Sequence, residues 1–192
     1  MFLSVITLVH VPFINYGSIF FLIHLGLIST LYNVPEKSKG MFRFPLRSIP
    51  IVKIFLIAYV WSSMSSFLPA VITHEQVFTS QIILVFIAHL LFIISITLPF
   101  DIRDFQVDNE NALLTFPQLI GIIPTKLLAI VCLFIFTLII SNITQTWYIL
   151  YFSLFTSVLI LNSSVKRKEY YFTFYLDGTI ILYFITIILS FE

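Results

Sequence analysis

Four carboxylates fall within a stretch of ten residues, which is the part of the sequence best suited to chemistry. They are Asp101, Asp104, Asp108 and Glu110, in the segment LPFDIRDFQVDNENALLTFPQLIG. If this segment is helical, the three aspartates share one face, because they are spaced three and four residues apart. Like charges at this spacing repel one another, whereas Mg²⁺ prefers one or two carboxylates together with phosphate oxygens and water. The spacing therefore suits a Mg²⁺–diphosphate group, and the alternative is a solvated acidic loop whose charge Arg103 partly offsets.

The rest of the chain has the composition of a protein that folds in lipid. It has 192 residues, of which 59% are hydrophobic and 10% charged, and its mean hydropathy is +1.06. Soluble domains contain about 25% charged residues, and a soluble chain of this size could not bury so much apolar surface. The net charge of +1 argues against nucleic-acid binding through a basic face, and the lone Cys132 excludes an internal disulfide. We therefore expect an integral membrane protein.

Six apolar stretches have the length of a transmembrane helix, which needs about 20 residues. They cover roughly 16–33, 51–72, 80–99, 125–142, 146–163 and 173–190. A seventh stretch, 1–11, has about half the required length and is interpreted as a helix whose beginning is missing. The expected fold is an all-α, polytopic transmembrane bundle of about seven helices, forming a single domain over 1–192 that is truncated at its N-terminus.

The lysines and arginines gather in or beside three of the connections between these stretches. They are Lys37, Lys39, Arg43, Arg47, Lys53, Arg103, Lys126, Lys166, Arg167 and Lys168. With seven crossings the three connections lie on one face, and the connections of the opposite face contain neither residue type. By the positive-inside rule the charged face is cytoplasmic. We expect a multi-pass protein of the bacterial inner membrane whose N-terminus lies inside, and a six-crossing fold would keep the same loop orientation.

The aspartate segment resembles the second aspartate-rich motif of the UbiA superfamily of intramembrane prenyltransferases. Asp101 stands at the leading position of that motif, Asp104 and Asp108 stand at its paired aspartates, and TFPQLIG matches its tail. The segments LYNVPEKSKGMFRFPLRSIPIVKIFLIAYVW and YLDGTIIL are similar to the fourth-to-fifth helix region and to the start of the last helix. Family members have nine transmembrane helices, with this motif between the sixth and the seventh. Three expected spans also follow the motif here, so the resemblance implies helices 3–9 of that fold.

The resemblance implies a transferase that moves a polyprenyl group from its diphosphate to an aromatic, quinone-precursor-like or lipid acceptor in the membrane. It implies that Asp101, Asp104 and Asp108 bind Mg²⁺, with Asp104 and Asp108 as catalytic residues. Mg²⁺ and basic side chains would stabilise the charge on the departing diphosphate.

Three basic residues are the candidates for binding this substrate. Arg47 and Lys53 lie closest to a helix entrance, and Lys126 begins the span after the aspartate segment. The alternative is that these cations only set the topology and contact anionic lipids. Asp177, near the start of the last span, either completes the site or caps that helix. We favour the cap, because a negative charge is stabilised at a helix N-terminus.

Two histidines, His24 and His89, lie near the middle of their expected spans. Ionisable residues inside a membrane are candidates for function, and a histidine pair could ligate haem. We favour the alternative that both are hydrogen-bonded packing residues in aromatic-rich helices.

Two features depart from the family pattern. The sequence lacks the Asn/Asp-rich first motif, which supplies the other half of the metal site, and NENALL stands where many members carry Gly and Lys or Arg. We therefore expect little or no activity from this chain alone. The alternative from another class is a non-catalytic, degenerate homologue, or a subunit that needs a partner chain to complete its site.

Overall fold

The structure, a computed structural model, describes residues 16–33, 50–73, 78–110 and 113–190. Within these ranges it is helical and contains no strand, so the predicted all-α bundle is confirmed. The elements are α2 (Tyr16–Asn33), α3 (Pro50–Ile72), α4 (Ser80–Glu110), α5 (Phe116–Ile120), α6 (Ile122–Thr144), α7 (Tyr148–Asn162), the π-helix η3 (Tyr171–Leu176) and α8 (Gly178–Ser190). The predicted half-span 1–11 lies outside the described residues.

Four helical segments of the described chain are long and apolar enough to cross a membrane: α3, α4, α6 and the joined segment of η3 and α8. The apolar parts of α2 and α7 are shorter. Continuous apolar runs form helices in lipid because a helix satisfies its own backbone hydrogen bonds. Each of the six predicted full spans coincides with a helical segment, but only four of these segments have the predicted length. The stretches predicted over 16–33 and 146–163 form shorter apolar helices.

The largest difference from the predicted spans is in α4, which does not end near residue 99 but continues for 31 residues to Glu110. A helix of that length is about 46 Å long, whereas the hydrocarbon core of a bilayer is about 30 Å thick. The acidic end of α4 therefore extends beyond the apolar region as a continuation of the same helix.

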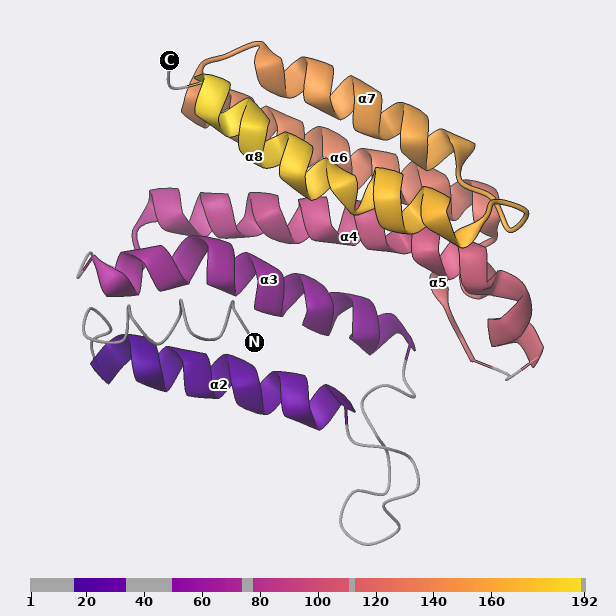
Figure 1. The fold of residues 1–192 in the computed structure, drawn as a ribbon, viewed down its shortest axis with the longest axis horizontal. Helices are drawn as coiled ribbons and strands as arrows, with labels where there is room; N and C mark the ends of the chain where they lie inside the picture. The colour runs from indigo at the N-terminus through magenta and orange to yellow at the C-terminus, as the bar shows by residue number, and fades with distance from the viewer. Residues whose placement is uncertain (1–15, 34–49, 74–77, 111–112, 191–192) are drawn as a thin grey trace, which may run out of the picture.

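Helix α4 lies at the centre of the bundle (Figure 1). It packs most extensively against α6 on one side and α3 on the other. Helix α2 packs on α3, and α7 packs against both α6 and α8. Because α4 has neighbours on two sides, it connects the N-terminal and C-terminal helices of the described bundle.

Four aromatic rings from four different helices meet in the core. They belong to Phe92 of α4, Phe136 of α6, Phe152 of α7 and Tyr183 of α8, and all six pairs of ring centroids are 5.0–6.2 Å apart. Rings at these separations and at mostly tilted angles attract one another. Helices in lipid gain little from removing apolar surface, so their association depends on such close packing. We call these four rings the aromatic cluster.

Hydrogen bonds between helices add to this packing. Ser66 Oγ lies 3.0 Å from His89 Nδ1, and His89 Nε2 lies 3.1 Å from the Tyr183 hydroxyl, so α3, α4 and α8 are joined. On the other side of the bundle, His24 Nε2 lies 3.1 Å from the Tyr59 hydroxyl and joins α2 to α3. His24 and His89 thus each have a tyrosine partner, which agrees with the packing interpretation of these two residues.

We predict that Phe136→Ala lowers the free energy of unfolding by about 3 kcal/mol, because it leaves a cavity among three other rings. The matched control is Phe134→Ala on the same helix, whose side chain is 60% exposed and whose loss should cost less than about 0.5 kcal/mol. The measurement is reversible unfolding in mixed micelles with increasing denaturing detergent. Equal losses for the two variants would contradict the role of the aromatic cluster.

Candidate functional site

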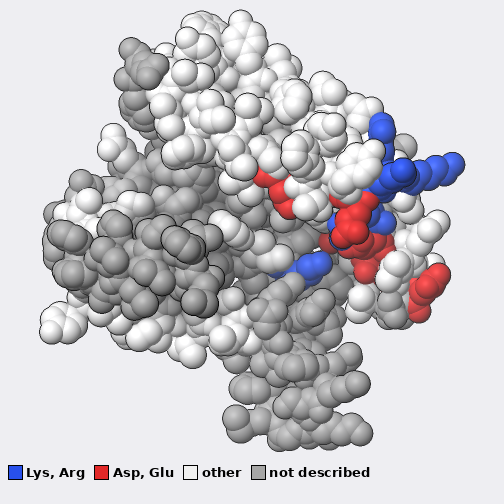
Figure 2. All heavy atoms as spheres, viewed as in Figure 1, with Lys and Arg blue, Asp and Glu red and all other residues white. Residues whose placement is uncertain are grey.

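The charged residues of the described chain gather toward one end of the bundle (Figure 2). They lie where α3, α6 and α8 begin and where α4 and α7 end, which is one end of a bundle of alternating helices. Lys53, Arg103, Lys126 and the basic run 166–168 therefore lie at the same end of the described bundle, whereas the predicted basic loop over 37–47 lies outside the described residues.

A pocket of about 210 Å³ opens at this end, between the start of α3, the end of α4 and the start of α8. Its lining combines charged side chains with a short apolar wall. The charged residues are Lys53, Asp101, Arg103, Asp104 and Asp177, and the apolar ones are Ile54, Ile57 and Phe100. We call it the acidic pocket.

Asp101 is the most deeply buried charged residue of the acidic pocket, with a side chain that is only 4% exposed. Its Oδ2 atom is buried and makes no hydrogen bond with any described residue. Lys53 lies close enough to act on this carboxylate electrostatically, and so do Asp104 and Asp108, which repel it. A buried carboxylate oxygen without a partner is costly, so native structures retain one only for a reason. Burial raises the pKa of this carboxyl to about 7. Either a proton or a bound cation would satisfy the oxygen, and the neighbouring carboxylates of Asp104 and Asp108 favour a cation.

Asp104 is paired with its neighbour Arg103. Arg103 Nε lies 2.7 Å from Asp104 Oδ1, and Nη2 lies 2.9 Å from Oδ2, which is a two-point ion pair of the strong type. The guanidinium also lies over the rings of Phe100 and Phe172, 5.2 and 5.6 Å from their centroids, where a cation is attracted to the ring face. Arg103 is thus held at the pocket, a role that the sequence analysis missed when it considered only its charge.

The structure brings together some of the predicted site residues and not others. Lys53, Asp101 and Asp104 line the acidic pocket. Asp108 does not line it, although it is close enough to Lys53 and Asp104 for electrostatic interaction. Lys126 is also outside the lining, and its Nζ donates a hydrogen bond to the carbonyl oxygen of Leu161, 2.8 Å away at the end of α7. A further predicted ligand, Arg47, falls outside the described residues.

Asp177 enters the acidic pocket from the opposite side of the bundle, directly after the π-helix η3. Its backbone N–H donates to the carbonyl oxygen of Phe172, five residues back and 3.0 Å away. This wider turn is typical of π-helices, which are frequent at functional sites. It brings a third carboxylate near Arg103, whose guanidinium it influences electrostatically. Of the two interpretations of Asp177, its position in the pocket favours completion of the site.

The TFPQLIG segment forms the turn that follows the acidic end of α4. Its five-residue helix α5 packs against both α4 and α6. Gly121 then joins α5 to α6 with φ +91° and ψ 161°, a conformation that essentially only glycine adopts without strain. This backbone conformation explains why the residue at position 121 is a glycine. The turn packs against α4 and so supports its acidic end.

The described residues include no group of three or more histidine, cysteine, aspartate or glutamate side chains placed to hold a metal ion. Mg²⁺ does not need such a group, because it is commonly held by one or two carboxylates plus phosphate oxygens and water. Asp101, with its unpartnered oxygen, and Asp104 in the same pocket fit that requirement. Asp104 would have to release Arg103 to take part.

No protein-family model, no curated protein and no solved structure matches this chain.

We predict that, at a pH above the raised pKa of Asp101, Asp101→Asn raises the free energy of unfolding of the metal-free protein by about 1 kcal/mol. The cost of burying this charge, together with its repulsion by Asp108 and Asp104, outweighs its attraction to Lys53. Asp108→Asn, on the same helix and less buried, is the matched control and should change it by less than about 0.5 kcal/mol. Detergent unfolding in the presence of a chelator measures both. If Asp101→Asn destabilises the protein instead, its carboxylate is already satisfied and the reason for assigning it a cation disappears.

Proposed function

We propose that the acidic pocket binds the Mg²⁺ complex of a polyprenyl diphosphate, as the substrate site of a UbiA-type membrane prenyltransferase. The reaction transfers the prenyl group to an aromatic or lipid acceptor dissolved in the membrane. The observation that carries the proposal is the buried, unpartnered carboxylate oxygen of Asp101 in a pocket that also contains Asp104, Lys53 and Arg103.

The chemistry of the lining matches a substrate with a charged head and an apolar chain. Asp101 and Asp104 are the candidate ligands for Mg²⁺, and Lys53 and Arg103 are the candidate partners of the diphosphate oxygens. Arginine suits this role because its planar fork binds phosphate at two points. The apolar wall lies against the same lining, so the first carbons of the chain would meet side chains rather than water.

In the reaction, the bond between the allylic carbon and the diphosphate oxygen breaks, and the electron pair leaves with the diphosphate. A bond then forms between that carbon and the acceptor, which gives up a proton. When bound, Mg²⁺ supplies neutralisation of the charge that develops on the leaving group. Lys53 stabilises the same charge from α3, and Arg103 does so after exchanging Asp104 for phosphate.

A second candidate function is a non-catalytic protein, or a subunit completed by a partner chain. It is favoured by the ion pair that occupies Asp104 and by the absence, among the described residues, of a group of three or more side chains placed to hold a metal ion. The two candidates differ in turnover. The non-catalytic protein transfers no prenyl group, whether or not it binds the diphosphate in a metal-dependent way.

The test is calorimetric binding of farnesyl diphosphate to the purified protein in lipid nanodiscs, with Mg²⁺ or with a chelator. We expect binding only with Mg²⁺, and at least a tenfold loss in Asp101→Asn and in Asp104→Asn, because each removes one of two metal ligands. Glu110→Gln, an exposed carboxylate at the end of α4, is the matched control and should change affinity less than about twofold.

Prenyl transfer to a soluble phenolic acceptor, followed in the same samples, separates the two candidate functions. Turnover that Asp104→Asn abolishes supports the transferase. Binding without turnover supports the non-catalytic alternative. Binding that needs no Mg²⁺ and is unchanged in Asp101→Asn would sink the proposal for the acidic pocket.

A further inference from the structure

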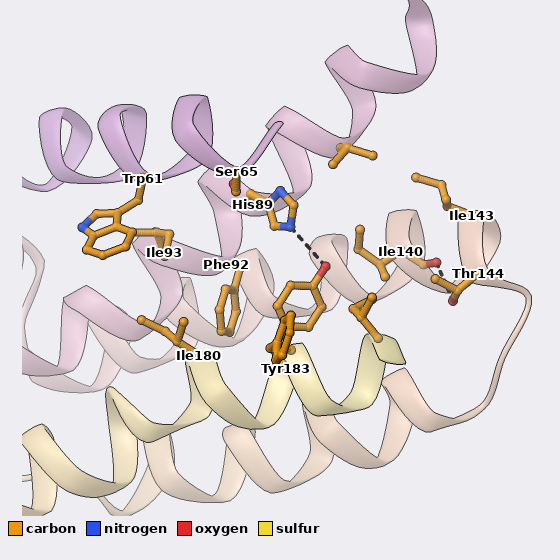
Figure 3. A pocket seen from close by; sticks show the side chains of 13 residues that line it. Trp61, Ser65, His89, Phe92, Ile93, Ile140, Ile143, Thr144, Ile180 and Tyr183 are labelled. Carbon is orange, nitrogen blue, oxygen red and sulfur yellow. Dashed lines mark hydrogen bonds between the residues drawn. The ribbon is translucent and has the colours of Figure 1, made fainter. Parts of the chain in front are cut away.

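A second cavity, of about 480 Å³, lies in the apolar part of the bundle between α3, α4, α6 and α8 (Figure 3). This volume is within the range of sites for small organic ligands. On α4 its His89 precedes Asp101 by twelve residues, which is about 18 Å along a helix. None of its lining residues is Asp, Glu, Lys or Arg. It is partly open to the surface of the bundle, because Trp61 and Phe184 in its lining are 56% and 64% exposed. We call it the inner cavity.

Most of the inner cavity is lined by aliphatic and aromatic side chains, and its main polar feature is a hydrogen-bonded pair. Figure 3 shows His89 of α4 and Tyr183 of α8 meeting across it, with Trp61 of α3 farther along the wall. The far nitrogen of His89 is held by Ser66, which is itself buried. Both ring nitrogens of His89 therefore have a partner, Ser66 at Nδ1 and Tyr183 at Nε2. The fixed imidazole in turn orients the Tyr183 hydroxyl.

Counting donors and acceptors shows that the Tyr183 hydroxyl retains one unused hydrogen-bonding position. A neutral imidazole has one donor and one acceptor nitrogen. If Ser66 donates to His89, then His89 donates to Tyr183, and the phenol hydrogen is left over. If His89 donates to Ser66, the phenol donates to His89, and an oxygen lone pair is left over. In both arrangements the hydroxyl has no second partner among the described residues.

We propose that the inner cavity binds an uncharged, water-insoluble molecule that carries one hydroxyl or carbonyl oxygen, and that this oxygen bonds to the Tyr183 hydroxyl. A charged ligand would lose its hydration without gaining an ionic partner. A pure hydrocarbon would leave the phenol unsatisfied. A hydroxyl fits both arrangements of the His89–Tyr183 pair. A carbonyl fits only the arrangement in which His89 donates to Tyr183, because the phenol hydrogen is then free to bond to the ligand. The inference does not depend on the function proposed for the acidic pocket.

The protein contains two tryptophans, so one substitution makes a reporter of the inner cavity. Trp147→Phe removes a tryptophan that is 75% exposed and lies outside the lining, and leaves Trp61 as the only indole. The probes are a matched pair, 8-bromo-1-octanol and 1-bromooctane, since bromine quenches indole fluorescence and the two molecules differ in one hydroxyl. In nanodiscs we expect saturable quenching by the alcohol at concentrations where the bromoalkane gives only the linear quenching of a solute in lipid.

Three further variants test the hydrogen bond and the location. Tyr183→Phe keeps the ring and should weaken binding of the alcohol about tenfold, the effect of one lost hydrogen bond. Tyr59→Phe breaks the other histidine–tyrosine bond, outside the inner cavity, and should leave affinity unchanged. Val85→Phe fills the cavity from α4 and should abolish saturable quenching. Because Tyr183→Phe and Val85→Phe test the site independently, a folding defect in one of them does not decide the result.

Three results would overturn this inference. One is equal saturable quenching by both probes, which would mean that the hydroxyl is not recognised. Another is an unchanged affinity in Tyr183→Phe. The third is displacement of the alcohol by farnesyl diphosphate only when Mg²⁺ is present, because the inner cavity would then hold the chain of a ligand anchored in the acidic pocket. Binding of the alcohol in a chelator, together with failure of diphosphate binding, would overturn the proposed function and leave this inference intact.

Discussion

The packing of Phe92, Phe136, Phe152 and Tyr183 is the interaction on which the rest of this structure depends. In lipid, apolar side chains gain little by leaving one apolar environment for another, so helices associate through close contact and through hydrogen bonds between them. The aromatic cluster supplies the contact for α4, α6, α7 and α8. The hydroxyl of Tyr183 extends this connection through His89 to α3. Five helices are therefore held at one level of the bundle.

Helix α4 connects the aromatic cluster to the charged end of the bundle, because it contains both Phe92 and Asp101. Asp101 follows Phe92 by nine residues, about 14 Å along the helix, so its position is set by a packed core rather than by a loop. That rigidity lets the protein keep a buried carboxylate oxygen with no hydrogen-bond partner among the described residues. Sites for ligands are often less stable than they could be, because groups that wait for a partner cost free energy until it binds. In the acidic pocket, the buried Oδ2 atom of Asp101 is such a group.

The sequence predicted the features that follow from local pattern. Continuous apolar runs indicated the spans, and the spacing of Asp101, Asp104 and Asp108 indicated one helical face, which the continuous α4 provides. The two-point pair of Arg103 with Asp104 was missed, because adjacent residues of a helix do not normally face each other. It forms here where the aromatic rings of Phe100 and Phe172 hold the guanidinium.

Tertiary packing decided what local pattern could not. The two roles considered for Asp177 could not be separated without the π-helical turn that precedes it. The partner of Lys126 is a carbonyl oxygen on another helix, and no pattern in the sequence marks it. The partners of His24 and His89 are also on other helices. In each case the missing information was which helix lies opposite.

We propose that a metal-bound diphosphate binds at Asp101. The most direct measurement replaces Mg²⁺ with Mn²⁺ and records the electron–nuclear spectrum of the protein with farnesyl diphosphate in nanodiscs. We predict coupling of Mn²⁺ to phosphorus in the unmodified protein and its loss in Asp101→Asn, with the coupling retained in Glu110→Gln. A spectrum of hydrated Mn²⁺ in the unmodified protein, or phosphorus coupling that persists in Asp101→Asn, would contradict the account.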